Sequence, residues 1–251
     1  TTGLPLLAPY LAELESGPMN REGDPAVLAD APAAVTWDGR RLPGPWLVLR
    51  AMQLATERAA RCGTGTVVIR QSHHIACLAA YHQRATEQGL LMLLACSDAN
   101  SASVAPAGGL DPVFTPNPIS AGIPTGGVPV IVDISTAATT NGLTNRLHQQ
   151  GGKLPAQWLV DGRGEPSDDP AVLFQEPRGT ILPLGGIASG HKGSGLSLPV
   201  GALTGGLAGP VPTTPPPACV APVSTPVIAP RRFPAPHAHP PTAPPPSRPR
   251  S

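Results

Sequence analysis

Val67-Val68-Ile69-Arg70-Gln71-Ser72-His73-His74 is the stretch that decides the fold of this chain. Its β-branched apolar run predicts a buried strand, and the run ends in a hydroxyl and two imidazoles. Helical spacing follows from Ile75 to about Gln88, and Gly89 is a typical C-terminal stop. A strand that delivers a histidine to the start of a helix can hold a proton-transfer group rigidly near neutral pH. The alternative is a histidine pair that only caps or packs.

Composition excludes several classes of function. The 251 residues carry a net charge of +1, which gives no indication of a nucleic-acid or membrane-surface partner. No apolar run reaches the ~18 residues of a membrane span. The four cysteines, Cys62, Cys77, Cys96 and Cys219, show no paired spacing. We therefore expect a cytoplasmic protein with reduced thiols, no nucleic-acid partner and no membrane contact.

Apolar periodicity predicts the remaining elements. A strong helix is expected from Trp46 to Arg61, with Gly63 behind it, and a short one from Tyr10 to Glu15. Strands are expected at residues 34–37, 90–95, 119–123 and 128–134, and the last two are expected to pair as a hairpin.

The composition changes at Pro210. From there to Ser251 about every third residue is proline and no acidic residue occurs. Apolar periodicity stops, so burial can offset little of the ordering entropy. We expect a disordered or polyproline II tail over residues 210–251. The tail is either genuine sequence or the product of a shifted reading frame in GC-rich DNA.

A second chemical candidate is the segment Gly190-His191-Lys192-Gly193-Ser194-Gly195. Glycines let backbone N–H groups approach an anion, and Lys192 adds a positive charge at a potential helix start. The segment is neither a Walker loop nor GxGxxG, so a flexible turn is the alternative.

The third candidate is Asp133, which ends an apolar strand and precedes Ser135 and Thr136. An acid at a strand end can accept hydrogen bonds from ribose hydroxyls. The alternative is an N-cap for the segment that follows. By contrast, His73 and His74 form a poor metal site, because adjacent residues point apart on a strand and no Cys or carboxylate lies at ligand spacing. We expect no metal.

Taken together, several motifs resemble the malate/L-lactate dehydrogenase family of NAD(P)-dependent oxidoreductases, which includes ureidoglycolate, sulfolactate and 2,3-diketogulonate oxidoreductases. The resemblance covers about residues 1–209. Its carriers are Ser72-His73-His74, Pro106-Ala107-Gly108-Gly109, Thr115-Pro116-Asn117-Pro118, Val132-Asp133-Ile134-Ser135, Ser167-Asp168-Asp169-Pro170, Leu182-Pro183-Leu184-Gly185-Gly186 and Gly190-His191-Lys192-Gly193.

The resemblance implies an α+β fold in which a helical N-terminal part, residues 1–62, lies beside an NAD(P)-binding and catalytic domain, residues 63–209. That domain is not a Rossmann fold and is built on a mostly antiparallel sheet. The resemblance also implies a homodimer and a small 2-hydroxy or 2-oxo acid as substrate.

Site residues follow from the same resemblance. His74 matches the active-site histidine of the Ser-x-His motif and is expected to exchange the substrate hydroxyl proton. The implied contacts to the cofactor, NAD or NADP, are Ser97, Asp133, Ile134, Ser135, His191 and Lys192.

Two substrate-binding positions depart from the family. Its Ser-His-Gly motif supplies a proton-donor His, and a nearby Arg holds the substrate carboxylate; here these positions are Thr2 and Leu6. A threonine hydroxyl does not exchange protons near neutral pH as imidazole does, and leucine cannot pair with a carboxylate. The sequence therefore predicts an oxidoreductase that transfers hydride between nicotinamide and a 2-hydroxy or 2-oxo acid. The alternative is a non-catalytic or inactive remnant, or a Pro-rich interaction protein.

Overall fold

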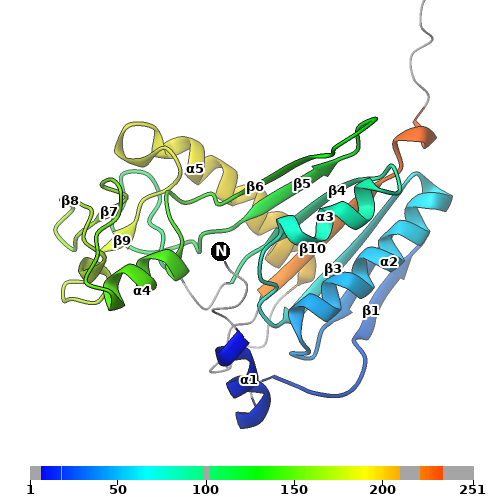
Figure 1. Ribbon diagram of the computed structural model, residues 1–251, viewed down its shortest axis with the longest axis horizontal. Helices are drawn as coiled ribbons and strands as arrows, with labels where there is room; N and C mark the ends of the chain where they lie inside the picture. Colours follow the sequence, from blue (N-terminus) through cyan, green and yellow to red (C-terminus); the bar gives the residue numbers. More distant parts are fainter. Residues whose placement is uncertain (1–6, 18, 99–101, 210–220, 234–251) are drawn as a thin grey trace, which may run out of the picture.

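The computed structural model describes residues 7–17, 19–98, 102–209 and 221–233, and a seven-stranded sheet forms its framework (Figure 1). The strand order is β1-β2-β3-β10-β4-β5-β6. The bounds are β1 (Ala26–Ala31), β2 (Ala34–Asp38), β3 (Thr64–Ser72), β4 (Leu91–Cys96), β5 (Ile119–Ile123), β6 (Val130–Ile134) and β10 (Ala221–Ile228). In this sheet β2 and β3 pair in parallel, and the other neighbours are antiparallel. The expected mostly antiparallel sheet is confirmed.

The stretch that decides the fold forms β3, close to the centre of this sheet. Val67 and Ile69 are fully buried on it. The predicted long helix is α2 (Gly44–Cys62), which links β2 to its parallel neighbour β3. Gly63 ends the helix with a left-handed φ of 83°, a conformation that glycine adopts without strain.

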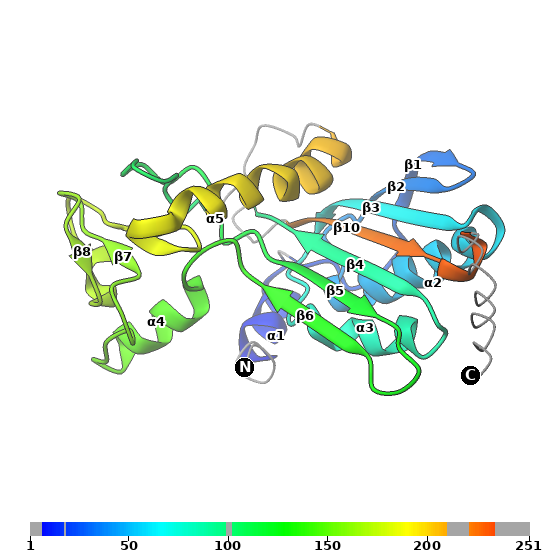
Figure 2. The ribbon, with the colours of Figure 1, turned by 90° about the horizontal axis from the view of Figure 1, so that it is seen from above.

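Helices cover both faces of the main sheet. Helices α2 and α3 (Ala79–Thr86) lie over one face, and α5 (Gly186–Gly201) crosses the other (Figure 2). The five-residue π-helix η3 (Ala202–Gly206) continues α5. The main core lies between α2 and the sheet and includes Leu47, Val48, Ala51, Ala55, Val67, Ile69, Met92, Leu94, Val223 and Val227.

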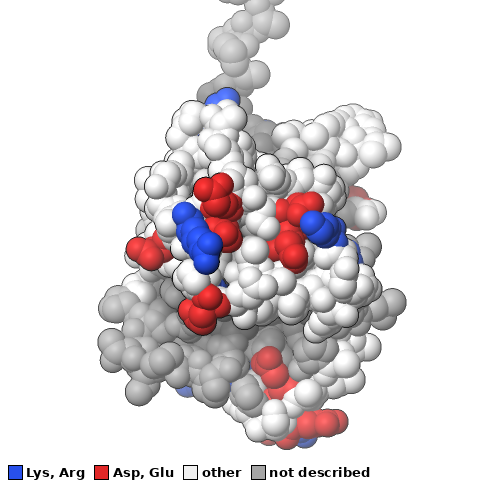
Figure 3. All heavy atoms as spheres, turned by 90° about the vertical axis from the view of Figure 1, so that its left-hand side faces the viewer, with Lys and Arg blue, Asp and Glu red and all other residues white. Residues whose placement is uncertain are grey.

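A smaller unit lies at the left of Figure 1 and has its own core. Its three-stranded sheet has the order β8-β7-β9 and packs beside α4. The bounds are α4 (Asn141–Gln149), β7 (Leu159–Val160), β8 (Pro166–Ser167), the 3₁₀ turn η2 (Pro170–Leu173) and β9 (Thr180–Ile181). The face at this end carries interspersed acidic and basic side chains (Figure 3).

The main difference from the sequence prediction is β10, which lies between β3 and β4 in the centre of the sheet. The expectation of a disordered tail from Pro210 is therefore wrong for residues 221–233, where β10 is followed by the 3₁₀ turn η4 (Pro230–Arg232). Val223 and Val227 are fully buried. The composition change consequently does not mark the end of the folded chain. Residues 210–220 and 234–251 lie outside the described part.

Proline explains why β10 was missed. Proline has no N–H for a sheet ladder, so prolines in a run argue against a central strand. Here Pro222 lies at the register shift between Ala221 and Val223. Pro226 is opposite Thr66 of β3, in a stretch where no pairing with β4 is recorded. The strand tolerates both prolines because neither has to donate to β4.

Two further expectations need correction. In the N-terminal part expected to be helical, residues 26–31 form the strand β1, which was not predicted, whereas the strand expected at residues 34–37 is present as β2. The helix expected from Ile75 begins only at Ala79, because Ala76 takes a left-handed φ of 61°. The predicted short N-terminal helix is present as α1 (Leu7–Ser16), and the hairpin is present as β5 and β6. Within the described residues, no helix has the length and apolarity needed to cross a membrane.

Candidate active site

The histidine pair lies immediately after β3, where α2 begins. The Ser72 hydroxyl donates to the His73 carbonyl at 2.8 Å, and the His73 N–H donates to the Leu42 carbonyl at 3.3 Å. A Cβ at Gly44 would overlap the carbonyl oxygens of His73 and His74. Only glycine therefore allows the first turn of α2 to approach the pair so closely, and this contact fixes the histidine backbone.

Helix α1 supplies two side chains to the same place. The Tyr10 hydroxyl is hydrogen-bonded to Nδ1 of His74, and the Glu13 carboxylate pairs with Nε2 of the buried His73. The Tyr10 ring meets the His73 ring edge-on, with centroids 5.4 Å apart. Sequence reasoning missed both residues. The sequence signal that could have identified them is their spacing of three residues on a predicted helix, which puts both side chains on one face.

The His74 ring is held in a defined protonation state. The Ala76 N–H donates to Nδ1 at 3.1 Å, and a backbone amide can only donate. Burial lowers the pKa of His74, and His73 lowers it further, whereas the carboxylates of Asp98 and Glu13 raise it. The resting ring is therefore neutral, with its lone pair on Nδ1 and its proton on Nε2. In that form it can donate a hydrogen bond from Nε2.

Asp133 lies at the edge of the sheet, near the loop that follows His74. Its Oδ2 accepts a hydrogen bond from the Ala79 N–H at 2.8 Å, where α3 begins, and Cys77 Sγ approaches the same oxygen at 3.7 Å. Asp133 thus caps a helix, although it caps α3 and not the segment that follows it in sequence. Its side chain is exposed.

The glycine-rich segment is helical, so the flexible-turn alternative is wrong. Ser189, with φ −138° and ψ 20°, interrupts α5, and a new turn starts at Gly190. His191 and Lys192 are exposed on this turn. A Cβ at Gly193 would overlap the Leu184 backbone. Glycine therefore lets α5 lie against the chain beside the end of β6.

The two candidate cofactor serines are engaged within the protein. Ser97 Oγ lies 2.9 Å from Thr204 Oγ1 of η3. Ser135 Oγ donates to the Pro116 carbonyl at 2.9 Å and accepts from the Ala137 N–H at 3.0 Å. The neighbouring Thr136 bonds Ser197 of α5 at 2.8 Å. The ends of β4 and β6 therefore converge on α5 and η3.

Not every candidate residue joins this cluster. Asp133 points to α3, whereas Lys192 is on α5 across the sheet (Figure 2). Ile134 is exposed on β6. Thr2 and Leu6 lie outside the described residues. The structure therefore divides the candidates between a His74–Asp133 side and an α5 side.

A sequence profile described as malate/L-lactate dehydrogenase matches residues 1–218. The chain belongs to this family. It is 33% identical over 211 residues to malate dehydrogenase of Pyrococcus abyssi, covering 82% of this chain and 57% of that protein. It is 35% identical over 202 residues to a Δ(1)-pyrroline-2-carboxylate/Δ(1)-piperideine-2-carboxylate reductase of Pseudomonas syringae pv. tomato, covering 80% and 56%.

The fold comparison agrees with the sequence comparison. The crystal structure of Δ1-piperideine-2-carboxylate reductase from Pseudomonas syringae superposes with a TM-score of 0.79 at 31% identity, covering 91% of this chain and 69% of that one. The resemblance to the malate/L-lactate dehydrogenase family is confirmed, and the family and its relatives are oxidoreductases. The chain spans little more than half the length of the curated relatives it matches.

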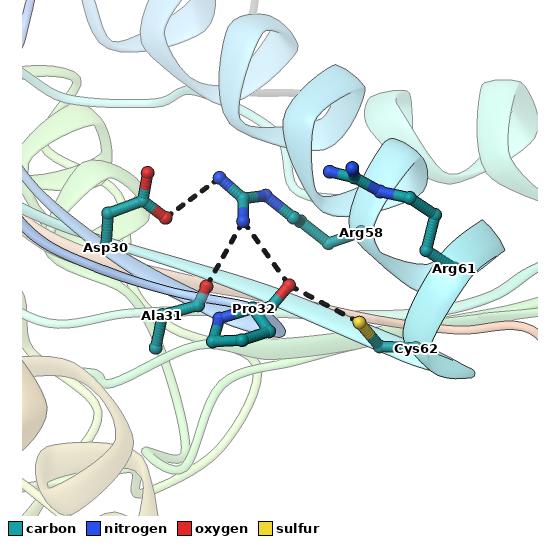
Figure 4. Close-up of a pocket in the computed structure, with 6 residues that line it drawn as sticks. All are labelled: Asp30, Ala31, Pro32, Arg58, Arg61 and Cys62. Carbon is teal, nitrogen blue, oxygen red and sulfur yellow. Dashed lines mark hydrogen bonds and ion pairs between the residues drawn. The ribbon is translucent and has the colours of Figure 1, made fainter.

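Two surface hollows lie apart from these candidate residues. One, of about 450 Å³, lies between the β1–β2 turn and the end of α2 (Figure 4). In it Arg58 bonds Asp30 at 2.8 Å and the carbonyls of Ala31 and Pro32, so its charge is compensated. The other lies between α2 and α3. No cluster of three or more His, Cys, Asp and Glu in the described part could hold a metal ion.

Proposed function

We propose that this chain is an NAD(P)-dependent oxidoreductase that transfers hydride between nicotinamide and C2 of a 2-hydroxy or 2-oxo acid. The observation that carries the proposal is His74, a half-buried imidazole fixed at a strand end with its resting proton on Nε2. Membership of the malate/L-lactate dehydrogenase family supplies the class of reaction.

The chemistry of the candidate residues fits a dinucleotide. Lys192 is an exposed cation without an ion pair in the described part of the chain, so its charge is available for a phosphate. Asp133 is an exposed carboxylate that can accept ribose hydroxyls. We assign further contacts to Ser97, Ile134, Ser135 and His191. When bound, the nicotinamide supplies or accepts the hydride.

His74 handles the proton that accompanies the hydride. In reduction, the ring in its imidazolium form donates the Nε2 proton to the substrate carbonyl oxygen, which accumulates negative charge as the C2 centre is reduced, and the ring is left neutral with its proton on Nδ1. In oxidation, the neutral ring that carries its proton on Nδ1 receives the hydroxyl proton on the lone pair of Nε2.

We further propose a homodimer, following the family resemblance, and a reducing compartment such as the cytoplasm. Cys62, Cys77 and Cys96 are free thiols, which supports such a compartment.

Thr2 and Leu6 motivate the second candidate function, an inactive or non-catalytic member of the family that binds dinucleotide without turnover. A missing Arg leaves a substrate carboxylate without a bidentate partner, which costs about 2–4 kcal/mol of transition-state binding. A missing imidazole removes about 10²–10⁴-fold in rate where His74 does not replace it. We therefore expect slow turnover of ordinary 2-oxo acids.

The test has two stages. Nicotinamide fluorescence on titration with NADH and NADPH measures binding, and a panel of 2-oxo acids with each cofactor then measures turnover. Binding with measurable turnover supports the oxidoreductase, and the double variant Thr2→His with Leu6→Arg should increase its kcat/KM. Binding without turnover in either protein favours the inactive member, and absence of binding contradicts both.

A further inference from the structure

Two donors of different kind meet Nδ1 of His74. The Ala76 N–H donates to it at 3.1 Å and has no lone pair with which to accept. The Tyr10 hydroxyl is also hydrogen-bonded to it, and a phenol can either donate or accept. The two contacts therefore respond differently when the ring is protonated.

We propose that Tyr10 is a positioning residue for His74, and that its hydroxyl reverses its hydrogen bond when Nδ1 of the ring gains or loses a proton. In the neutral ring the hydroxyl donates to the Nδ1 lone pair. In the imidazolium the Nδ1 proton points to the Tyr10 oxygen, which accepts it. The proposal rests on the proposed function only in taking His74 as the group that exchanges the proton.

The reversal matters because the ring is half-buried and its Nδ1 faces protein groups. Without Tyr10, the Nδ1 proton of the imidazolium would face the Ala76 N–H, and a half-buried charged donor without an acceptor is unfavourable. The Tyr10 oxygen therefore provides the acceptor for the Nδ1 proton that the Ala76 N–H cannot provide.

The ring contacts also fix its orientation. Tyr10 and His74 have ring centroids 5.9 Å apart at 57°, and the Tyr10 hydroxyl also lies 3.4 Å from the His74 carbonyl oxygen. Because α1 carries Tyr10 and its Glu13 pairs with His73, the helix is attached to both histidines. Docking of α1 thus sets where the His74 ring points.

Other charged groups act on the same titration. His73, the neighbour in the chain, opposes protonation of His74, while Glu13 on α1 and Asp98 after β4 favour it. These groups remain in a Tyr10→Phe variant, which removes one oxygen and keeps the ring. A change in titration then reports the hydroxyl alone.

The experiment is an NMR titration of the His74 ring in the full chain, with its signal assigned by its loss in His74→Gln. Tyr10→Phe should lower the His74 pKa by about one pH unit, the scale of one hydrogen bond. The matched control is Tyr81→Phe, which removes the hydroxyl of the chain's other tyrosine, bonded to the Ile75 carbonyl in the same loop. It should leave the His74 titration unchanged.

Turnover gives an independent readout. In Tyr10→Phe, the falling limb of the pH profile for 2-oxo acid reduction should move to lower pH by the same amount, with an unchanged Kd for the dinucleotide. An unaltered His74 titration, or an equal shift in Tyr81→Phe, overturns the proposal. The ring titration needs no turnover, so an inactive wild-type chain would refute the proposed function and leave the Tyr10 result to be judged separately. Circular dichroism and the His82 signal check the fold.

Discussion

The Asp133 carboxylate on β6 accepts a hydrogen bond from the Ala79 backbone N–H at 2.8 Å, which joins the edge strand of the main sheet to the first residue of α3. The first N–H groups of a helix have no partner within the helix, so removing the acceptor of one of them leaves it without a hydrogen bond. Asp133→Ala should lower the free energy of unfolding by about 1 kcal/mol. Urea denaturation of Asp133→Asn, which keeps an acceptor, should show a smaller loss. Equal stability of Asp133→Ala and wild type would show that the contact contributes nothing to the free energy of unfolding.

Residues 221–233 should be required for folding. β10 pairs with both β3 and β4, the Thr225 hydroxyl donates to the Val67 carbonyl at 2.9 Å, and Val223 and Val227 are buried in the core. A chain ending at Gly209 divides the sheet and leaves β3 and β4 each without one of its two neighbours, so it should fail to give a cooperative thermal transition. The matched truncation ends at Phe233 and should unfold cooperatively like the full chain. A cooperative fold without β10 would refute this placement.

How far the sequence predicted the fold depends on local signals. The runs at Val67–Ile69 and Trp46–Arg61 carry their periodicity and stop signals within a few residues, and both elements were predicted correctly. β10 could not be predicted, because its prolines argue against a hydrogen-bonded central strand and because its position depends on strands far away in sequence. Ile75 to Leu78 are not helical because Ala76 is left-handed and Asp133 caps α3 further on.

The candidate site shows the same contrast between local sequence signals and long-range contacts. His74 was marked by its own motif, whereas its contact with Tyr10 joins residues 64 positions apart. Nothing local signals that pairing beyond the shared face of Tyr10 and Glu13. Similarly, the glycines around Lys192 suggested an anion loop or a flexible turn, and only packing against Leu184 shows that they allow a helix to approach closely.

Lys192 should bind the dinucleotide by its charge. Lys192→Ala should weaken NADH or NADPH binding by roughly 1.5–3 kcal/mol, the scale of a hydrogen bond to a charged group. The chain's other lysine provides the control, because Lys153 pairs with Asp168 at 3.1 Å in the smaller unit. Lys153→Ala should leave the affinity unchanged in a fluorescence titration. Equal affinities for the Lys192 variant and wild type would remove this residue from the cofactor site.

His82 should make stability depend on pH. It is fully buried with Nε2 2.6 Å from the Ser120 hydroxyl, and burial lowers its pKa, so the folded state holds it neutral. The unfolded chain binds the proton below about pH 6.5. Stability should therefore fall as the pH drops through that value, and the fall should level off below the folded-state pKa. In His82→Gln, urea denaturation from pH 7 to pH 5 should show a weaker dependence. An identical slope would contradict the burial of a neutral ring.

Hydride transfer to carbon is the central claim, and isotope transfer tests it most directly. The chain is incubated with NADH or NADPH deuterated at C4 of the nicotinamide and a panel of 2-oxo acids, and the products are analysed by mass spectrometry. The account predicts a 2-hydroxy acid with deuterium at C2, and at least a ~10²-fold slower rate in His74→Asn with little change in dinucleotide affinity. Unlabelled acids throughout, or an unchanged rate in His74→Asn, would contradict it.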